Sequence, residues 1–293
     1  MLAINLTETD PVGLMIARML SDLREQALDT LLPVTGNTKR LRPIYNRLEQ
    51  VLFEELQKQA QQIPYSQILI FYQRELLLTE AAIDLEINVA AVVGESLEGG
   101  VENFAAALEP ALAAAMAEGM RATIADLVAE LGLDAAEAAA FSAPLEQMTI
   151  KWAKEHAGEL VRGINSTTQK EIADSVARAL AEQKGVPGLT RDLQAKLGDL
   201  LGRKRAELIA TTEMNIAVST GAFRAAKEVG ASEKEWITQG DNRVSQSICQ
   251  PNEGDGMISI DAEFQSGHSF TPGHPRCRCG VAYHGANPKL LGA

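Results

Sequence analysis

The chain has 293 residues, of which 46% are hydrophobic and only 4% aromatic, and its formal net charge is −12. This composition excludes a disordered chain, and the abundance of alanine and leucine favours helices over sheets. Residues 1–159 hold 11 Lys and Arg against 24 Asp and Glu, and such a surface favours solvent or a basic protein partner over duplex DNA.

Capping and breaking residues predict successive helices in the first 160 residues. Pro11, behind an acidic cap, opens a helix that should run to about residue 32. A second helix is expected at 38–62, because Pro43 stands near its first turn and Pro64 follows its end. Further helices are expected at 65–93, closed by Gly94, and then at 101–119, 120–131 and 135–157, with kinks or breaks at Pro110 and Pro144.

Apolar stretches in this half indicate packing and not membrane insertion. The alanine runs at 105–107 and 113–115 fit either close helix packing or ordering against a partner. The stretch 68–93 contains five charged residues, each of which costs about 2.5–3.5 kcal/mol at a bilayer centre. We expect a buried or partner-facing helix there and no membrane anchor. Residues 1–6 lead into acidic residues, so no signal peptide is expected and synthesis should occur in a reducing cytoplasm.

Two overlapping capping boxes mark a second group of helices. Ser166 precedes Gln169 by three residues and Thr168 precedes Glu171 by three, which is the pattern of a helix N-terminus. We therefore expect a helix to begin there and to stop at Gly185.

Two more helices are predicted before residue 230. The first should be capped by Thr190 and present one apolar face formed by Leu193, Leu197 and Leu200. The second begins at Arg203 and ends at Gly230. Its apolar residues recur every seven positions and should face a core, namely Ile209, Ile216 and Phe223.

Beyond Gly230 the pattern changes to short strands. Trp236-Ile237 and residues 257–260 read as strands, with a turn at Asp255-Gly256 before the second, and the alternation from Cys279 to Tyr283 predicts a third. The predicted fold is therefore mainly α. It consists of a long acidic helical region, residues 1–160, followed by a small α+β C-terminal module with short strands, residues 161–293.

All three cysteines lie in this last part of the chain. Cys249, His274, Cys277 and Cys279 supply four soft ligands, which is enough for a closed tetrahedral zinc site. A unit of about 55 residues with little aliphatic content buries too little surface to be stable without a staple or a partner. The residues therefore leave three readings open, namely a structural zinc, ordinary reduced thiols, and a disulfide formed after release from the cell. His268 and His284 are substitutes for His274.

No catalytic residue is predicted. A catalytic zinc site needs an open coordination position and a carboxylate base. Asp241, Glu253 and Asp255 are close in sequence, but no helix motif of metal-binding histidines accompanies them. Asp241 and Arg243 are instead expected to form a turn-stabilising ion pair under Trp236.

A set of residues and motifs between 160 and 284 has a specific order. They are Thr167-Thr168, the helix from Arg205 to Gly221, Trp236, Asp241-x-Arg243, Gly254, Phe270 and the run from Pro272 to Cys279. This order resembles the phage Mu F-like minor head proteins, also called phage head morphogenesis proteins. Members of the family often have a cysteine pair shortly after the Asp-x-Arg, whereas here Ser245 takes the first place and Cys249 stands alone.

This resemblance implies a minor capsid protein of a tailed phage that acts without catalysis. It would belong to the virion, at the portal vertex of the head, and be needed for head assembly or DNA delivery. The partners implied are the portal protein, other head proteins and packaged DNA. Residues 1–160 show no such match, and from their position alone we expect them to be the arm that docks on the portal. The competing reading is a zinc-dependent hydrolase or nuclease carried in the head.

Overall fold

A computed structural model describes residues 38–75, 82–131 and 142–286. The helix expected near residues 12–32 lies outside these ranges. A mainly helical fold with a small sheet near the C-terminus confirms the predicted class. In chain order the elements are α2 (Thr38–Gln62), α3 (Tyr65–Glu75), α4 (Ala82–Glu98), α5 (Val101–Leu131), α7 (Ser142–Ala181), α8 (Val186–Leu200), α9 (Arg203–Val229), β1 (Ala231–Ile237), α10 (Cys249–Gly254), β2 (Met257–Ser259) and β3 (Gly280–Ala286).

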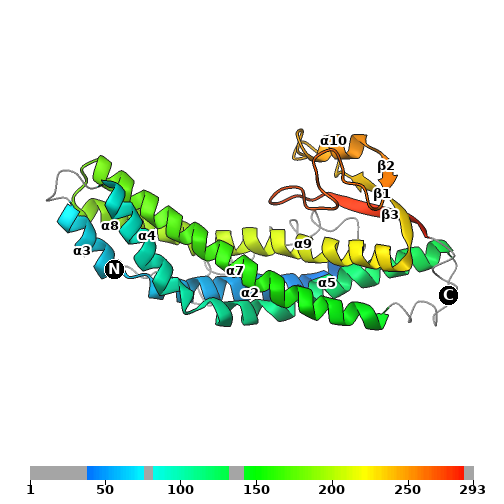
Figure 1. Ribbon diagram of the computed structural model, residues 1–293, viewed down its shortest axis with the longest axis horizontal. Coiled ribbons are helices and arrows are strands. Elements are labelled where there is room, and N and C mark those ends of the chain that lie inside the picture. The colour runs from blue at the N-terminus through cyan, green and yellow to red at the C-terminus, as the bar shows by residue number, and fades with distance from the viewer. Residues whose placement is uncertain (1–37, 76–81, 132–141, 287–293) are drawn as a thin grey trace, which may run out of the picture.

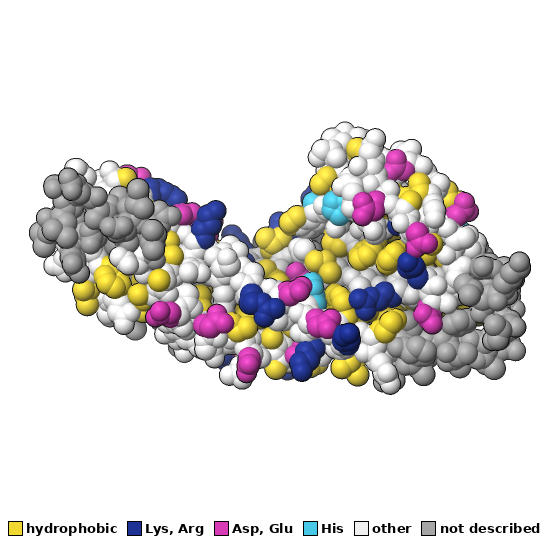
Figure 2. Space-filling view, viewed as in Figure 1, with side chains coloured by type: hydrophobic (Ala, Val, Ile, Leu, Met, Phe, Trp, Pro, Cys, Tyr) yellow, Lys and Arg dark blue, Asp and Glu magenta, His cyan; other side chains and the backbone are white. Residues whose placement is uncertain are grey.

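The helices form an elongated body, and the strands with α10 form a module that stands on α9 (Figure 1). A hollow separates this module from the far end of the body, and on the same face acidic side chains are interspersed with basic ones (Figure 2). One hydrophobic core extends from Leu41 in α2 to Tyr283 in β3. The helical body and the C-terminal part therefore share a core. Among the described residues, no helix is both long enough and apolar enough to cross a membrane.

The prolines correctly predicted the bounds of α2, whereas the glycine predicted to end the following helix does not end it. α2 spans the predicted residues 38–62. The helix end expected at Gly94 is wrong, because α4 continues through Gly94 to Glu98. Within the predicted stretch 65–93, the structure describes α3 and the start of α4, and residues 76–81 lie outside the described ranges. A Cβ at Gly94 would lie 2.8 Å from Nε2 of Gln169 in α7, and this amide donates to the Ala90 carbonyl at 2.6 Å. Gly94 therefore makes room for a side chain of α7 and does not end α4.

Helices α5 and α9 cross with their backbones in direct contact. A Cβ at Gly119 would lie 2.1 Å from the Val218 carbonyl oxygen, and a Cβ at Gly221 would lie 2.1 Å from the Met116 carbonyl oxygen. The expected helix end at Gly119 is therefore wrong, since α5 runs unbroken past it and also contains Pro110. Close packing, one of the two readings of the alanine-rich sequence, agrees with buried alanines on α5, namely Ala105, Ala111 and Ala115.

The helix start predicted at Ser166 and Thr168 is also wrong. α7 is a single helix of 40 residues that runs through residue 160 and through both capping boxes. The Thr167 hydroxyl donates to the Gly163 carbonyl at 2.9 Å and the Thr168 hydroxyl donates to the Ile164 carbonyl at 2.8 Å. These bonds go four residues back along the same helix, so the hydroxyls are satisfied in a helix interior and do not act as caps. The expected break at Pro144 coincides with the first turn of α7, where proline is tolerated.

Helix α8 begins before the predicted cap. Its first residue is Val186, and the Thr190 hydroxyl donates to the Val186 carbonyl at 2.9 Å, as in a helix interior. The predicted apolar face is confirmed, since Leu193, Leu197 and Leu200 are buried.

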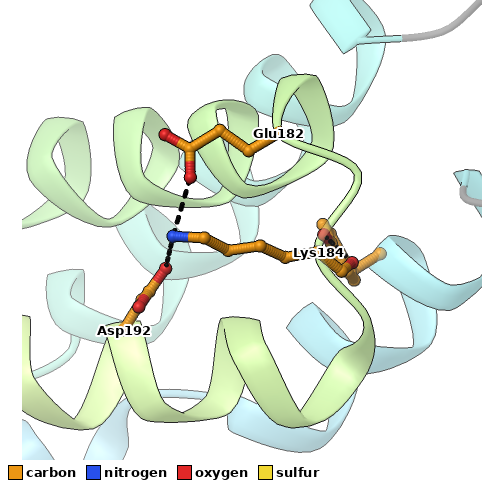
Figure 3. Close-up of polar contacts among 4 residues, drawn as sticks. Glu182, Lys184 and Asp192 are labelled. Atoms are coloured by element: carbon orange, nitrogen blue, oxygen red, sulfur yellow. Dashed lines mark hydrogen bonds and ion pairs between the residues drawn. The ribbon is translucent and has the colours of Figure 1, made fainter.

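Two ion pairs of Lys184 connect the turn between α7 and α8 to α8 (Figure 3). The Lys184 ammonium lies 2.8 Å from a carboxylate oxygen of Glu182 and 2.7 Å from one of Asp192. The Tyr72 hydroxyl of α3 donates to the Lys184 carbonyl at 2.7 Å. Residues of α3, of α8 and of the turn after α7 therefore meet at Lys184.

Helix α9 has the predicted bounds but a different buried face. It ends at Gly230, whose φ of 85° suits the left-handed cap that glycine adopts readily. The face turned to the core is built largely from small residues, among them Ala206, Ala210, Ala217 and Ala225. Ile209 and Phe223 pack against this core only in part, and Ile216 is half-buried and belongs to neither hydrophobic cluster. The seven-residue spacing was therefore a poor guide, because close helix contact selects small side chains.

This difference changes the expected effects of truncating α9. Met214→Ala should lower the free energy of unfolding by about 2–5 kcal/mol, since Met214 is buried in the core. Ile216→Ala should cost about 1 kcal/mol, because its side chain is only half-buried. Urea unfolding followed by circular dichroism measures both. Equal losses in the two variants would contradict the assignment of faces.

The module is a three-stranded antiparallel sheet in the order β2-β1-β3. Lys234 of β1 is fully buried, and its ammonium donates to the Ser269 carbonyl at 2.7 Å. It lies 5.2 Å from the ring centroids of Phe223 in α9 and Phe264 in the module. Two aromatic faces and a carbonyl thus replace its water shell. The buried ammonium joins the module to α9.

Candidate metal centre

The start of α10 and the segment before β3 bring a cysteine and histidine cluster together. Cys249 is the first residue of α10, and His274 and Cys277 lie in the segment that leads into β3. The ligand atoms of these three residues all lie within 4.8 Å of one another. The Sγ atoms of Cys249 and Cys277 are 3.7 Å apart. Two thiolates on one tetrahedral zinc, with Zn–S bonds of about 2.3 Å, stand about 3.8 Å apart. The arrangement can therefore hold a metal ion.

Backbone geometry places the second loop against α10. A Cβ at Gly273 would lie 2.6 Å from Cγ2 of Ile248, so a larger residue here would have to displace the Ile248 side chain. The Cys277 amide donates to the His274 carbonyl at 3.0 Å, which closes a turn. The Cys277 carbonyl accepts from Nδ2 of Asn215 at 2.6 Å. The cluster is therefore anchored to α9 as well as to α10.

The fourth predicted ligand, Cys279, lies beside the other two thiols. Its hydrogen bond to Cys277 lowers the pKa of the Cys277 thiol and raises its own, and burial raises the pKa of Cys249. Negative charge on one sulfur thus opposes ionisation of the next. A cation among them would stabilise several thiolates together. Cys279 lies outside the group of three whose ligand atoms are mutually close.

Of the candidate histidines, only His274 lies with the cysteines among the described residues. Its Nδ1 is 2.9 Å from the Pro275 carbonyl and donates to it, which leaves Nε2 with a lone pair for a metal. His268 is hydrogen-bonded to Ser266 at 2.8 Å. His284 lies 3.4 Å from a carboxylate oxygen of Glu235. Neither substitute joins the cluster.

A small hydrophobic core surrounds the cysteines. Trp236 and Phe264 are buried in it, with their rings edge to face and their centroids 5.2 Å apart. The other members are Val244, Cys249, Cys277 and Cys279. Half of this core consists of the three cysteines. The packing of the module therefore depends on whether these thiols are free, joined in a disulfide or bound to a metal ion.

The predicted ion pair of Asp241 has a different partner. Asp241 accepts from the Arg243 backbone amide at 2.9 Å, but its carboxylate is paired with the Arg278 guanidinium, with both oxygens 2.6 Å from Nη2. The expected Asp241–Arg243 salt bridge is therefore wrong, because Arg278 reaches the turn from the segment before β3. Its hydrogen bond holds the pKa of Asp241 below the ordinary value.

This lowered pKa predicts an acid-dependent contribution to stability. Asp241→Asn should be less stable than the wild type above pH of about 4, where the unfolded carboxylate is ionised. The difference should shrink and vanish as pH falls through the lower, folded pKa of Asp241. Unfolding curves of both proteins between pH 2 and 7 test this. A difference that stays constant over that range would mean that the lost interaction is not ionic.

The carboxylates considered as catalytic bases all have structural partners. Glu253 accepts from the Thr238 amide at 2.9 Å and from its hydroxyl at 2.7 Å. Asp255 accepts from the Gln265 amide at 2.7 Å. Asp241 is paired with Arg278. Each of the three therefore holds a loop in place.

Comparison with known families confirms the resemblance over part of the chain. Residues 170–282 match the family described as Phage Mu protein F like protein. The match begins inside α7 and ends in β3, so it includes α8, α9 and the cysteine cluster. No curated protein and no solved structure matches the chain.

Proposed function

Because residues 170–282 form a Phage Mu F-like region, we propose that the protein is a minor capsid protein of a tailed phage, located at the portal vertex of the head. The observation that carries the proposal is the family match over the module and the helices that support it. Its role would be head assembly or DNA delivery, with the portal protein, other head proteins and packaged DNA as partners.

The acidic helical body is proposed as the part that docks on the portal. The sequence predicts this role for residues 1–160, but these residues share a core with the C-terminal part, so they cannot be tested by deletion. Deleting residues 1–160 would remove α2, α4 and α5 from the core that α9 completes. Loss of incorporation would then report misfolding and not loss of a docking surface. Point changes on exposed acidic residues avoid this.

Charge reversal on the body should therefore weaken portal binding. Asp126, Glu155 and Glu159 are exposed in this region, and changing all three to Lys should lower capture by a coexpressed portal oligomer at least about tenfold. The matched control reverses three exposed acids of the C-terminal part, Glu228, Glu233 and Glu263. Equal capture of both variants would reject docking through this acidic surface, and absence of the wild type from purified heads would reject the capsid role.

We propose zinc as the metal of the cluster, held by Cys249, His274, Cys277 and Cys279. A closed set of three sulfurs and one nitrogen is a structural site, since a catalytic zinc needs an open position. The engagement of Asp241, Glu253 and Asp255 in loop contacts supports this choice. These contacts favour a protein without catalysis over the zinc-dependent hydrolase or nuclease.

A further inference from the structure

The segment that carries two of the proposed ligands, residues 271–277, contacts α9 at both of its ends. At its start, the Thr271 and Ser219 hydroxyl oxygens are 2.8 Å apart. At its end, the Cys277 carbonyl accepts from Nδ2 of Asn215 at 2.6 Å. Ser219 and Asn215 are four residues apart on α9, so their side chains lie on the same face of the helix. One face of α9 therefore holds this ligand segment at two points.

The side-chain amide of Asn215 has a defined orientation. Its Oδ1 accepts from the Ser219 hydroxyl at 3.4 Å, within α9 itself. The amide oxygen thus faces a donor and the amide nitrogen faces the Cys277 carbonyl. A flip of the amide would set Oδ1 against the carbonyl oxygen. Nδ2 is therefore a fixed donor for the ligand segment.

The carbonyl that α9 holds belongs to the turn between two ligands. The Cys277 amide donates to the His274 carbonyl at 3.0 Å, which closes the turn. The backbone amides of Gly273 and Cys279 hydrogen-bond to the Cys277 sulfur. Peptide groups of the segment thus direct this sulfur, which is 3.7 Å from Sγ of Cys249. A rotation of the Cys277 peptide group would therefore displace a ligand atom.

Other contacts attach the module to α9 without Asn215. The Phe270 ring stacks on the Phe223 ring of α9, with the centroids 5.0 Å apart. The buried Lys234 ammonium donates to the Ser269 carbonyl at 2.7 Å and lies over the Phe223 ring. These contacts precede the ligand segment, so loss of the Asn215 amide leaves them in place. The bond from Asn215 therefore acts on the turn between the ligands.

We propose that Asn215 is a positioning residue of the metal centre, through which α9 sets the metal affinity of the ligand segment. The proposal rests on the proposed zinc site and not on the capsid assignment. Asn215 is no ligand, and it acts through Cys277. It holds the Cys277 peptide group in the metal-binding orientation, so the ion does not have to order the turn when it binds. Partners behind a metal ligand typically change metal affinity by about 10–100-fold when they are removed.

The zinc affinity of Asn215→Leu, measured on the full chain, tests the proposal. Leucine has the same number and branching of heavy atoms as asparagine, but it donates no hydrogen bond. Competition with a chromophoric chelator should give a dissociation constant at least about tenfold above that of the wild type. Asn215→Ala should give a similar increase. The visible absorption of bound Co²⁺ should change in both variants, because it reports how the thiolates surround the ion. Circular dichroism should show unchanged helix content.

Thr212→Val is the matched control. Thr212 is half-buried on α9, and its hydroxyl donates to the Leu208 carbonyl of the same helix at 2.9 Å. The variant removes a polar group of α9 without removing a bond to the ligand segment, so it should bind zinc and Co²⁺ like the wild type.

The outcomes separate the positioning role from the metal site itself. If the wild type binds zinc and both Asn215 variants bind it equally tightly, Asn215 only anchors the module and the positioning role is wrong. An equal loss of affinity in Thr212→Val would contradict it as well. If the wild type binds neither zinc nor Co²⁺, the proposed zinc site is wrong and the positioning role falls with it.

Discussion

Replacing Gly119 by alanine should lower the free energy of unfolding by about 3 kcal/mol, near the upper end for overpacked sites. The new methyl group would stand 2.1 Å from the Val218 carbonyl oxygen of α9. Backbone cannot move aside as a side chain can, so α5 and α9 must separate along their crossing. Thermal and urea unfolding, both followed by circular dichroism, measure the loss.

Two further variants sharpen this test. Gly221→Ala should cost a similar amount, because its methyl group would meet the Met116 carbonyl oxygen at 2.1 Å. The double variant should cost less than the sum, since one separation of the helices relieves both clashes. Gly163→Ala is the control, because Gly163 of α7 has no atom within 4 Å of a Cβ and should gain about 0.5–1 kcal/mol. A loss below about 0.5 kcal/mol for Gly119→Ala would show that the crossing is not close.

Removal of the proposed zinc should have the second large effect. The purified protein should contain about one zinc per chain, and a chelator should make residues 231–286 sensitive to protease. Cys277→Ser should lower zinc content and protease resistance together. The reason is that the small core around Trp236 is half cysteine, so it has few apolar side chains to hold it without the ion.

Histidine variants separate the ligands from their neighbours. His274→Ala should reduce zinc content, whereas His284→Ala should leave it unchanged, because His284 faces Glu235 and not the thiols. Less than about 0.2 zinc per chain in reduced, folded wild-type protein would exclude the site. The cysteines would then be core thiols, and contact with α9 would stabilise the module.

Local sequence signals located the elements whose ends are decided locally. Pro64 follows α2 and Gly230 caps α9, and in both cases the residue itself forbids or favours the next backbone step. Alternating apolar residues and turn residues likewise predicted the short strands of the module. These signals need no knowledge of the rest of the fold.

Other signals failed where tertiary contact decides the outcome. Gly94 and Gly119 look like helix ends in sequence, but each is a glycine because another helix touches it. Thr168 fits a capping box equally well, yet its hydroxyl is satisfied within α7. Sequence reasoning does not distinguish a glycine that ends a helix from one that lets a second helix approach.

The cluster could be predicted in composition but only partly in geometry. The spacing of Cys277 and Cys279 fixes their proximity, whereas the contact with Cys249 depends on how α10 packs on the segment before β3. Asp241 illustrates the same limit, since Arg278 is distant in sequence and Arg243 is near.

The junction of α9 and β1 has a mechanical consequence. Gly230 alone separates the helix from the strand, and Asn215 and Ser219 tie α9 to the segment before β3 by bonds of 2.6 Å to Cys277 and 2.8 Å to Thr271. These contacts restrict rotation of the sheet relative to α9. A pull on the module is transmitted along the axis of α9, and the crossing with α5 carries it into the body. We therefore expect the module and α9 to move together as one unit.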